Sequence, residues 1–302
     1  MSKAVAQFPI EQEYIKNPDI SPEDIQKLRE WLTTQPHLPE KYLDDLDLLV
    51  TYHCCENSAE VAKQVLDLHF TLRTLFTPYF KDRCFDKKAE YTLETVVFAP
   101  LPMPLVRGYR GFYARLIDPD PRHFNFVDVV RTFMMVFDLW QYEEGTWPGF
   151  ELIVDLDTAV AGHLARVEIM AIRQVLYFLQ ECMLIKLKAV HFLNAPGWMD
   201  KLMMMLKPFL RKDLLGLICI HQRESDSVYK YIPKAALPKG AGGDYKDFET
   251  IKEETLERLQ NNRDFFRDEN RRRVNEALRK GKKTTVEDIF GIQGSFKKLD
   301  ID

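Results

Sequence analysis

The sequence lacks the features that mark several protein classes. No apolar run reaches the ~18 to 20 residues that a membrane-spanning helix requires, and the opening MSKAVAQFPIEQEY has no long apolar core of a signal peptide. The 5 cysteines are an odd number without a CxxC pair, which favours buried free thiols over disulfides or zinc ligands. We therefore expect a cytoplasmic protein without a structural metal.

Charge of one sign and catalytic motifs are also scarce. The 42 basic and 46 acidic residues leave a net charge of −4, so no global field favours a nucleic-acid partner. There is no GxSxG, GxxxxGK[ST] or HExxH motif and no GxGxxG after a strand. The usual support for hydrolase, nucleotide-binding and zinc-enzyme functions is absent. We expect a protein that is not an enzyme and uses no cofactor.

A few polar residues still stand where an α/β enzyme could use them. Asp155 and Asp157 end a predicted strand, but no His, Ser or Cys lies at a diagnostic spacing, so turn or helix-capping roles are favoured. His191 and His221 are interpreted as structural. The glycine-rich stretch 240–243 is interpreted as a turn. An enzyme using Asp155 or Asp157 is the weakest of three functional hypotheses.

The first ~90 residues read as short helices. Ser21 before Pro22 is typical of a helix N-terminus. Ser58 begins another helix, whose predicted apolar stripe is Val61, Val65, Leu68 and Leu72.

The pattern then changes to short apolar strands that alternate with helices. This predicts an α/β fold with a mixed, largely parallel sheet and flanking helices. The strands are expected at 95–99, 112–117, 152–154, 189–193 and 217–220, and the helices at 125–140, 167–183 and 198–210. After Gly243 a charged stretch predicts one long helix over 246–280. The expected domains are 1–90, helical; 91–245, α/β; and 246–302, a charged helix and tail.

The segment Trp198–Leu210 is the most informative feature that is present. It contains four methionines, whose unbranched, polarizable side chains adapt to irregular apolar partners. Leu202, Met203, Leu206 and Phe209 share much of one helical face. Elsewhere Phe133 and Phe137 lie one turn apart and Met134 adjoins them. These side chains are expected to line a cavity, although a buried packing helix explains each of them equally well.

Several stretches together resemble the CRAL-TRIO lipid-binding family, in its tocopherol-transfer and retinaldehyde-binding branch. They are LREWLTTQPHLP, AKQVLDLHFTLR, PGFELIVDLD, GHLAR, YFLQECMLIKLKAVHFLNAPGWMDKLMMMLKPFL and YKYIPKAALPKGAGG, in the order of that family. The resemblance implies a helical N-terminal domain followed by a lipid domain whose apolar pocket is closed by a mobile gate helix. By position, the gate is Trp198–Leu210.

The same resemblance implies the ligand-binding residues. They are Phe133, Met134, Phe137, Leu152, Val154, Val175, Leu179, Leu187, Trp198, Leu202, Met203, Leu206 and Phe209.

In that branch, basic residues near the gate bind phosphoinositide headgroups. Lys186 and Lys188 match such positions and, alternating on a strand, are expected to share a face. Other basic positions depart from the family. His53 stands at one, Asp213 and Leu217 stand at two more, and nearby Arg211 and Lys212 are expected to compensate. In LPKGAGG, Gly240 and Ala241 replace Glu and Tyr, and the loss of the Tyr is expected to widen a gap and alter ligand shape.

The leading hypothesis is a cytosolic carrier of one small hydrophobic ligand, of retinoid, tocopherol or carotenoid type. It would exchange this ligand at anionic membranes through transient contact. The alternative is a phosphoinositide-sensing membrane adaptor without cargo, suggested by the run Arg271–Arg273 in the charged C-terminal segment.

Overall fold

A computed structural model describes residues 4–291 and contains a five-stranded sheet with helices on both faces. The strand order is β1-β2-β3-β4-β5. β1 is antiparallel to β2, and the remaining pairs are parallel. The predicted mixed, largely parallel α/β sheet is confirmed. The strands are β1 (Val96–Pro100), β2 (Arg110–Leu116), β3 (Phe150–Asp155), β4 (Leu187–Ala195) and β5 (Ile218–Gln222).

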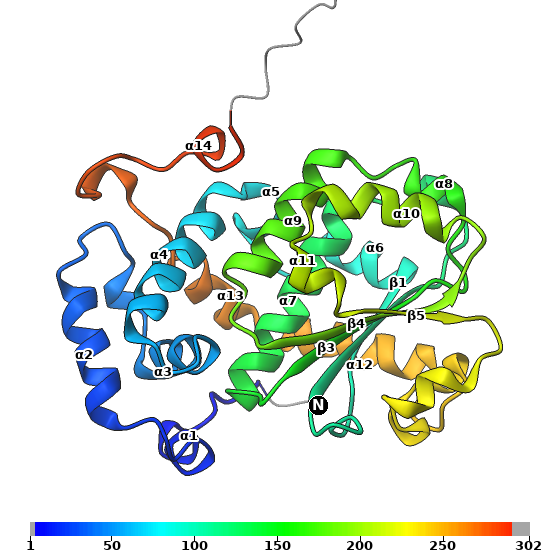
Figure 1. Ribbon diagram of the computed structural model, residues 1–302, viewed down its shortest axis with the longest axis horizontal. Helices are drawn as coiled ribbons and strands as arrows, with labels where there is room; N and C mark the ends of the chain where they lie inside the picture. Colours follow the sequence, from blue (N-terminus) through cyan, green and yellow to red (C-terminus); the bar gives the residue numbers. More distant parts are fainter. Residues whose placement is uncertain (1–3, 292–302) are drawn as a thin grey trace, which may run out of the picture.

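Helices α1 to α4 lie beside this sheet, α9 and α10 cover one of its faces and α12 covers the other (Figure 1). The α-helices are α1 (Ile10–Lys16), α2 (Pro22–Thr33), α3 (Asp45–Cys54), α4 (Ala59–Leu75), α5 (Thr77–Phe80), α6 (Lys87–Thr95), α7 (Phe126–Glu144), α8 (Ala161–Leu164), α9 (Ile169–Glu181), α10 (Met199–Leu206), α11 (Lys212–Leu215), α12 (Phe248–Asn261), α13 (Arg263–Glu269) and α14 (Val286–Phe290). Short 3₁₀ helices are η1 (Glu40–Tyr42), η2 (Pro121–His123), η3 (Lys207–Phe209), η4 (Asp226–Lys230), η5 (Lys234–Ala236), η6 (Lys239–Ala241) and η7 (Glu276–Leu278).

The N-terminal helices begin where their capping residues predict, but the apolar stripe predicted for α4 is only part of the buried surface of this helix. Ser21 and Asp24 form a reciprocal capping box at the start of α2. In α4, Val61 is 45% exposed, whereas Ala62, Leu66 and Phe70 are buried. These three pack in one core with residues of α2 and α3. Of the predicted stripe, Leu72 is fully buried in a second core and Val65 and Leu68 pack against that core, so α4 has apolar neighbours on two sides.

The two faces of the sheet are packed differently. On the α12 side, Val97, Tyr113 and Ile153 are fully buried in one continuous core. On the other side, α7 packs tightly against β1 and β2, but the side chains of Leu152 and Val154 remain partly accessible. β3 is the central strand, and central strands of parallel sheets are ordinarily buried on both faces. Space therefore exists on this side of the sheet.

The charged C-terminal segment is not the single helix predicted. It breaks at Asn262, whose Oδ1 accepts from the Val5 amide at 2.8 Å and whose Nδ2 donates to the Arg258 carbonyl at 2.7 Å. Ile251, Leu259 and Phe266 are buried. This packing against the body of the protein explains why a largely polar stretch is ordered. Residues 292–302 of the predicted tail lie outside the described residues.

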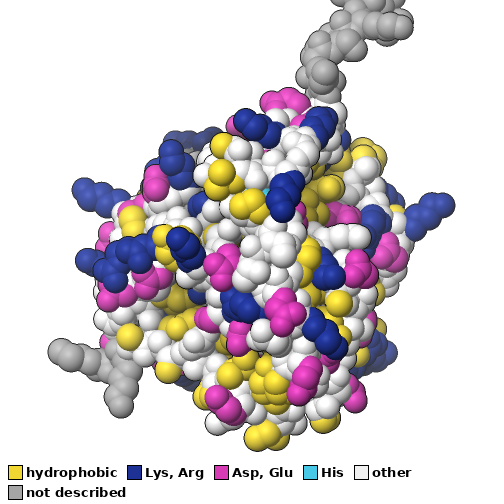
Figure 2. Space-filling view, turned by 90° about the vertical axis from the view of Figure 1, so that its left-hand side faces the viewer, with side chains coloured by type: hydrophobic (Ala, Val, Ile, Leu, Met, Phe, Trp, Pro, Cys, Tyr) yellow, Lys and Arg dark blue, Asp and Glu magenta, His cyan; other side chains and the backbone are white. Residues whose placement is uncertain are grey.

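Beyond α13 the chain runs back along the N-terminal helices (Figure 1). Arg272 binds Asp47 at 2.7 Å, and Arg273 binds Glu269 at 2.9 Å. On the face shown in Figure 2, basic and acidic side chains are interspersed and not gathered by sign. Within residues 4–291, no helix is both long and apolar enough to cross a membrane.

Candidate functional site

An apolar cavity of about 330 Å³ lies between the sheet and helices α9 and α10. All five strands contribute to its floor, α9 forms a wall, and the segment from α10 to α11 covers it. Its lining is almost entirely hydrocarbon: Val96, Phe98, Ala114, Arg115, Leu116, Phe124, Phe126, Val129, Leu152, Val154, Asp155, Leu156, Ala159, His163, Leu164, Val167, Val175, Leu176, Leu179, Leu187, Val190, Phe192, Trp198, Leu202, Leu206, Leu210, Leu214 and Ile218.

Short side chains on the floor help to keep this space open. Ala114 and Val154 are register partners on β2 and β3, and Val190 on β4 lies opposite Leu152. These residues reach less far above the sheet than the aromatic side chains under α7, where Phe112 and Phe150 fill the equivalent layer. The cavity consequently lies beyond the part of α7 that packs on Phe112 and Phe150, and α7 contributes only its first residues, Phe126 and Val129, to the lining.

The structure brings eight of the predicted ligand-binding residues together around the cavity. They are Leu152, Val154, Val175, Leu179, Leu187, Trp198, Leu202 and Leu206. Their role in binding stays a prediction.

The other five predicted residues lie elsewhere. Phe133 packs edge to face against Phe112, and Phe137 against Phe150, so both belong to the core between α7 and the sheet together with Met134. Met203 of α10 is buried in a cluster with Leu156 and Phe192, and Phe209 lies in η3, after the end of α10. Helical periodicity identified their apolar faces but not what those faces contact.

Sequence reasoning missed the end of the cavity formed by the β3–α9 connection and the residues around Phe124. Leu156, Ala159, His163 and Leu164 line this end. These residues lie in a short helix and loops, where periodicity is too brief to give a signal. Ala114 and Leu116 on β2 were missed as well, although their alternation in the sequence was a usable signal.

The predicted gate is built from two elements instead of one helix: α10, then η3 with Pro208 in its first turn. Leu202, Leu206 and Leu210 line the cavity, whereas Met204 on the outer face is 68% exposed. The far end of this segment is held by Gln180 of α9. Its Nε2 donates to the Phe209 carbonyl and its Oε1 accepts from the Arg211 amide, both at 2.9 Å.

Asp155 and Asp157 are engaged in a structural network. Asp155 accepts hydrogen bonds from Tyr113 Oη at 2.6 Å, Asn194 Nδ2 at 2.8 Å and the Asp157 amide at 3.0 Å. Burial, reinforced by Asp155, raises the pKa of Tyr113 well above its usual value. Arg115 binds both carboxylates, at 3.2 and 2.6 Å. These contacts leave Asp155 no free position for a substrate proton, and its bond to the Asp157 amide favours the turn role over the helix-capping one.

The two strand histidines form a buried chain on the opposite face of the sheet. His191 lies 2.9 Å from Glu151 and 3.0 Å from His221, whose other nitrogen lies 2.8 Å from Ser227 Oγ. Burial, with a contribution from His191, lowers the pKa of His221. This chain links three adjacent strands on the side away from the cavity and agrees with a structural role.

The gap was expected where Ala241 replaces a Tyr, but Ala241 packs against the core on the α12 face and does not line the cavity, and the neighbouring space at Gly240 is filled. A Cβ atom at Gly240 would lie 2.2 Å from the Phe248 ring, so this aromatic side chain fills the space. Phe248 stacks on Tyr113, and the Arg115 guanidinium lies 5.1 Å above its ring. This cluster belongs to the core on the α12 face. The replacement therefore leaves the shape of the apolar cavity unaffected.

The two lysines predicted to bind a phosphoinositide headgroup, Lys186 and Lys188, have different neighbours within the protein. Lys186 binds Glu56 at 3.1 Å, and Lys188 lies 6.0 Å from the centre of the Tyr109 ring. A bulge interrupts the alternation expected for this pair, because Phe150 pairs with Leu187 but Glu151 with Ala189.

The remaining basic positions lie near the end of the gate segment or beside Lys186. Arg211 contacts Glu181 at 3.2 Å and Asp213 at 3.3 Å, and Lys212 begins α11 with an exposed side chain. His53 is buried near Lys186, and desolvation together with that charge lowers its pKa to about 4. His53 is therefore neutral at physiological pH and adds no positive charge there.

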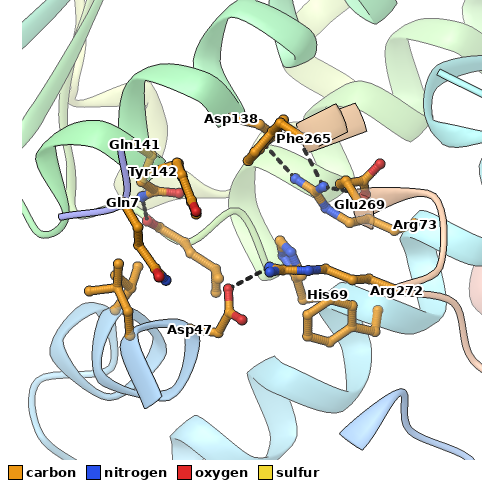
Figure 3. Close-up of a pocket in the computed structure, with 14 residues that line it drawn as sticks. Gln7, Asp47, His69, Arg73, Asp138, Gln141, Tyr142, Phe265, Glu269 and Arg272 are labelled. Carbon is orange, nitrogen blue, oxygen red and sulfur yellow. Dashed lines mark hydrogen bonds and ion pairs between the residues drawn. The ribbon is translucent and has the colours of Figure 1, made fainter. Parts of the chain in front are cut away.

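A second pocket, of about 70 Å³, lies where the N-terminal helices meet α7 and α13 (Figure 3). Arg73 binds Asp138 at 2.7 Å and Glu269 at 3.0 Å, and the fully buried Arg83 binds the same two carboxylates. Burial disfavours ionisation of Glu269, but the two arginines outweigh it and hold its pKa below the usual value. The charges compensate one another, so this pocket is a polar junction between helices.

Comparison with known proteins agrees with this geometry. Residues 106–243, which include most of the sheet and the gate segment, match the CRAL/TRIO domain model. The chain contains a CRAL/TRIO domain. The predicted family is thereby confirmed, and CRAL/TRIO proteins are lipid-binding and lipid-transfer proteins. Residues 17–89 match a second model, the Pinta-like UBA domain.

Individual relatives of the CRAL/TRIO chain are distant. Clavesin-1 of Xenopus laevis is 25% identical over 235 residues, covering 76% of this chain and 69% of that protein. Clavesin-1 of Mus musculus is matched over 65% of its length. The human alpha-tocopherol transfer protein-like protein is 25% identical over 145 residues, 47% of this chain and 42% of its own. A crystal structure of Sfh5 aligns with a TM-score of 0.46 and 11% identity, over 77% of this chain and 92% of Sfh5.

Proposed function

We propose that this protein is a carrier that encloses one small hydrophobic molecule, of retinoid, tocopherol or carotenoid type, without transforming it. The observation that carries the proposal is the cavity of about 330 Å³ over the central strand, lined almost entirely by hydrocarbon. Ligand pockets typically measure ~300 to 1,000 Å³. The exposure of Leu152 and Val154 within a central strand supports the same conclusion, since a self-filled core would cover them.

Hydrophobic burial alone is sufficient for useful affinity. Enclosing roughly 400 Å² of ligand hydrocarbon at about 25 cal/mol/Å² contributes on the order of 10 kcal/mol. The loss of translational and rotational freedom costs about 4 kcal/mol or more. The remainder, about 6 kcal/mol, corresponds to a dissociation constant on the order of tens of micromolar. No catalytic or charged group is required for a carrier of this kind.

Exchange of the ligand is proposed to occur when the segment Trp198–Leu210 moves away from the cavity. Leu202 and Leu206 on its inner face would then leave the ligand, and exposed Met204 on its outer face suits contact with an apolar boundary. Lys212 and Arg211 lie at the end of the same segment and suit an anionic surface. We accordingly propose a cytoplasmic protein with transient membrane association. The adaptor alternative gains no support, because Arg272 and Arg273 are paired within the chain.

Retinol transfer between vesicles tests this function, since retinol is itself fluorescent. Phosphatidylcholine donors and acceptors are compared with vesicles that also contain phosphatidylserine or a phosphoinositide. The variant Leu206→Trp, on the inner face of α10, is expected to abolish both binding and transfer. Met204→Trp, on the outer face of the same helix, is the matched control and is expected to bind retinol within about twofold of the unaltered protein. Transfer no faster than spontaneous exchange would refute the carrier.

A further inference from the structure

His163 lies at the end of the cavity that is formed by the connection between β3 and α9. It lies in α8, is 4% exposed and lines the cavity. Its ring meets Phe124, another lining residue, edge to face with centroids 5.3 Å apart. The imidazole is thus held between a short helix and an aromatic ring, at the boundary of an otherwise hydrocarbon space.

The hydrogen bond at Nδ1 of His163 determines whether Nε2 carries a proton. The Val160 amide donates to His163 Nδ1 at 3.0 Å. An amide nitrogen can only donate, so Nδ1 must present its lone pair and Nε2 must carry the proton. The 3.3 Å contact between Nδ1 and the Val160 carbonyl would require the opposite tautomer and is excluded by this bond. Burial lowers the pKa of His163, in keeping with a neutral ring.

Nε2 of His163 is buried and has no hydrogen-bond partner within residues 4–291. Such orphaned donors are rare in folded proteins and call for a specific explanation. Two other polar residues, Arg115 and Asp155, contribute to the lining; Arg115 Nε also lacks a partner, but both side chains make their contacts on the opposite face of the sheet. Arg115 stacks on Phe248 and Asp155 binds Tyr113, both on the α12 face of the sheet. His163 therefore offers a donor that the protein itself leaves unused.

We propose that His163 determines ligand specificity, its Nε2–H donating to an uncharged oxygen at one end of the bound hydrophobic molecule. This inference rests on the proposed carrier function and refines the ligand to a lipid aldehyde, ketone or alcohol. A pure hydrocarbon would leave the donor unsatisfied. A carboxylate would bring a full charge into a hydrocarbon space whose one lining cation among the described residues, Arg115, is already paired with Asp155 and Asp157, which is strongly unfavourable.

Three probes that share one isoprenoid skeleton test the proposal: farnesal, farnesol and the hydrocarbon farnesene. Binding is measured by competition with a fluorescent apolar probe. The unaltered protein is expected to bind farnesal and farnesol about five to ten times more tightly than farnesene, the gain of one buried hydrogen bond. In infrared spectra the carbonyl stretch of bound farnesal is expected at lower frequency than in hexane.

The variant His163→Asn separates this role from a structural one. Asparagine places an oxygen near the position of Nδ1 and so keeps an acceptor for the Val160 amide, but it lacks the distal donor. We expect the preference for oxygenated probes to fall to about onefold and the carbonyl shift to disappear, while farnesene binds as before. His163→Phe is expected to lose the preference as well. Leu206→Ala, as control, is expected to weaken all three probes equally.

The outcomes separate this inference from the proposed function. If farnesene binds as tightly as farnesal to the unaltered protein, or if His163→Asn keeps the preference, the specificity role is refuted and the carrier stands. If none of the three probes binds, the carrier function fails and the inference fails with it.

Discussion

A substitution of Val154 tests directly whether the space above β3 is empty of protein. In Val154→Phe, the larger ring would enter the cavity, whereas Ile153→Phe, the matched control one residue earlier, would enter the opposite face, where Ile153 is fully buried. The four added carbons of Val154→Phe bury apolar area at about 0.8 kcal/mol each, so the ligand-free protein should gain up to roughly 3 kcal/mol. Ile153→Phe overpacks a filled core and should cost about 1 to 3 kcal/mol.

Urea unfolding followed by far-ultraviolet circular dichroism measures both effects, and competition with retinol reports the accompanying loss of binding. We expect Val154→Phe to be more stable than the unaltered protein when ligand is absent and to bind retinol at least tenfold more weakly. Ile153→Phe should lose stability while the affinity of its folded fraction is kept. Equal destabilisation by both substitutions would show that the two faces are packed alike, and the reasoning would be wrong.

Two further predictions concern the pH response and the gate. Desolvation, aided by Arg73, lowers the pKa of His69 to about 3. The unfolded chain binds a proton at this histidine below pH ~6.5, whereas the folded protein does not. The free energy of unfolding should therefore fall by about 2 to 3 kcal/mol between pH 7.5 and 4.5. Urea titrations should show this part of the decrease absent in His69→Phe, and an unchanged pH slope would contradict it. Gln180→Ala removes both bonds to the gate segment, so retinol release in stopped flow should accelerate roughly five- to thirtyfold. Gln174→Ala on the same helix is the control, and equal rates for the two variants would exclude this restraint.

Much of the fold follows from local sequence signals. The five strands were predicted because each is a short apolar run bounded by turns, and Ser21 and Ser58 mark helix starts since their hydroxyls accept amide hydrogen bonds. The gate segment was located from its methionines and from the resemblance together. These features depend on neighbours in the chain, which is why sequence reasoning reached them.

The contents of the interior depend on distant contacts and escaped prediction. Phe137 and Leu152 were both predicted to line the cavity, yet Phe137 packs against Phe150 while Leu152 lines it. The space beside Gly240 is filled by Phe248, a residue eight positions later that no pattern connects to it. The orphaned donor of His163 was invisible for the same reason, because it is defined by the absence of an acceptor in three dimensions.

Native mass spectrometry of the protein as purified from cells is the most direct test of an apolar cavity that holds a ligand. The account predicts a species heavier than the polypeptide by one small molecule, which organic extraction recovers as a hydrophobic compound with an uncharged oxygen. A spectrum that shows the polypeptide mass alone, from a protein that also binds neither retinol nor farnesal, would contradict this account.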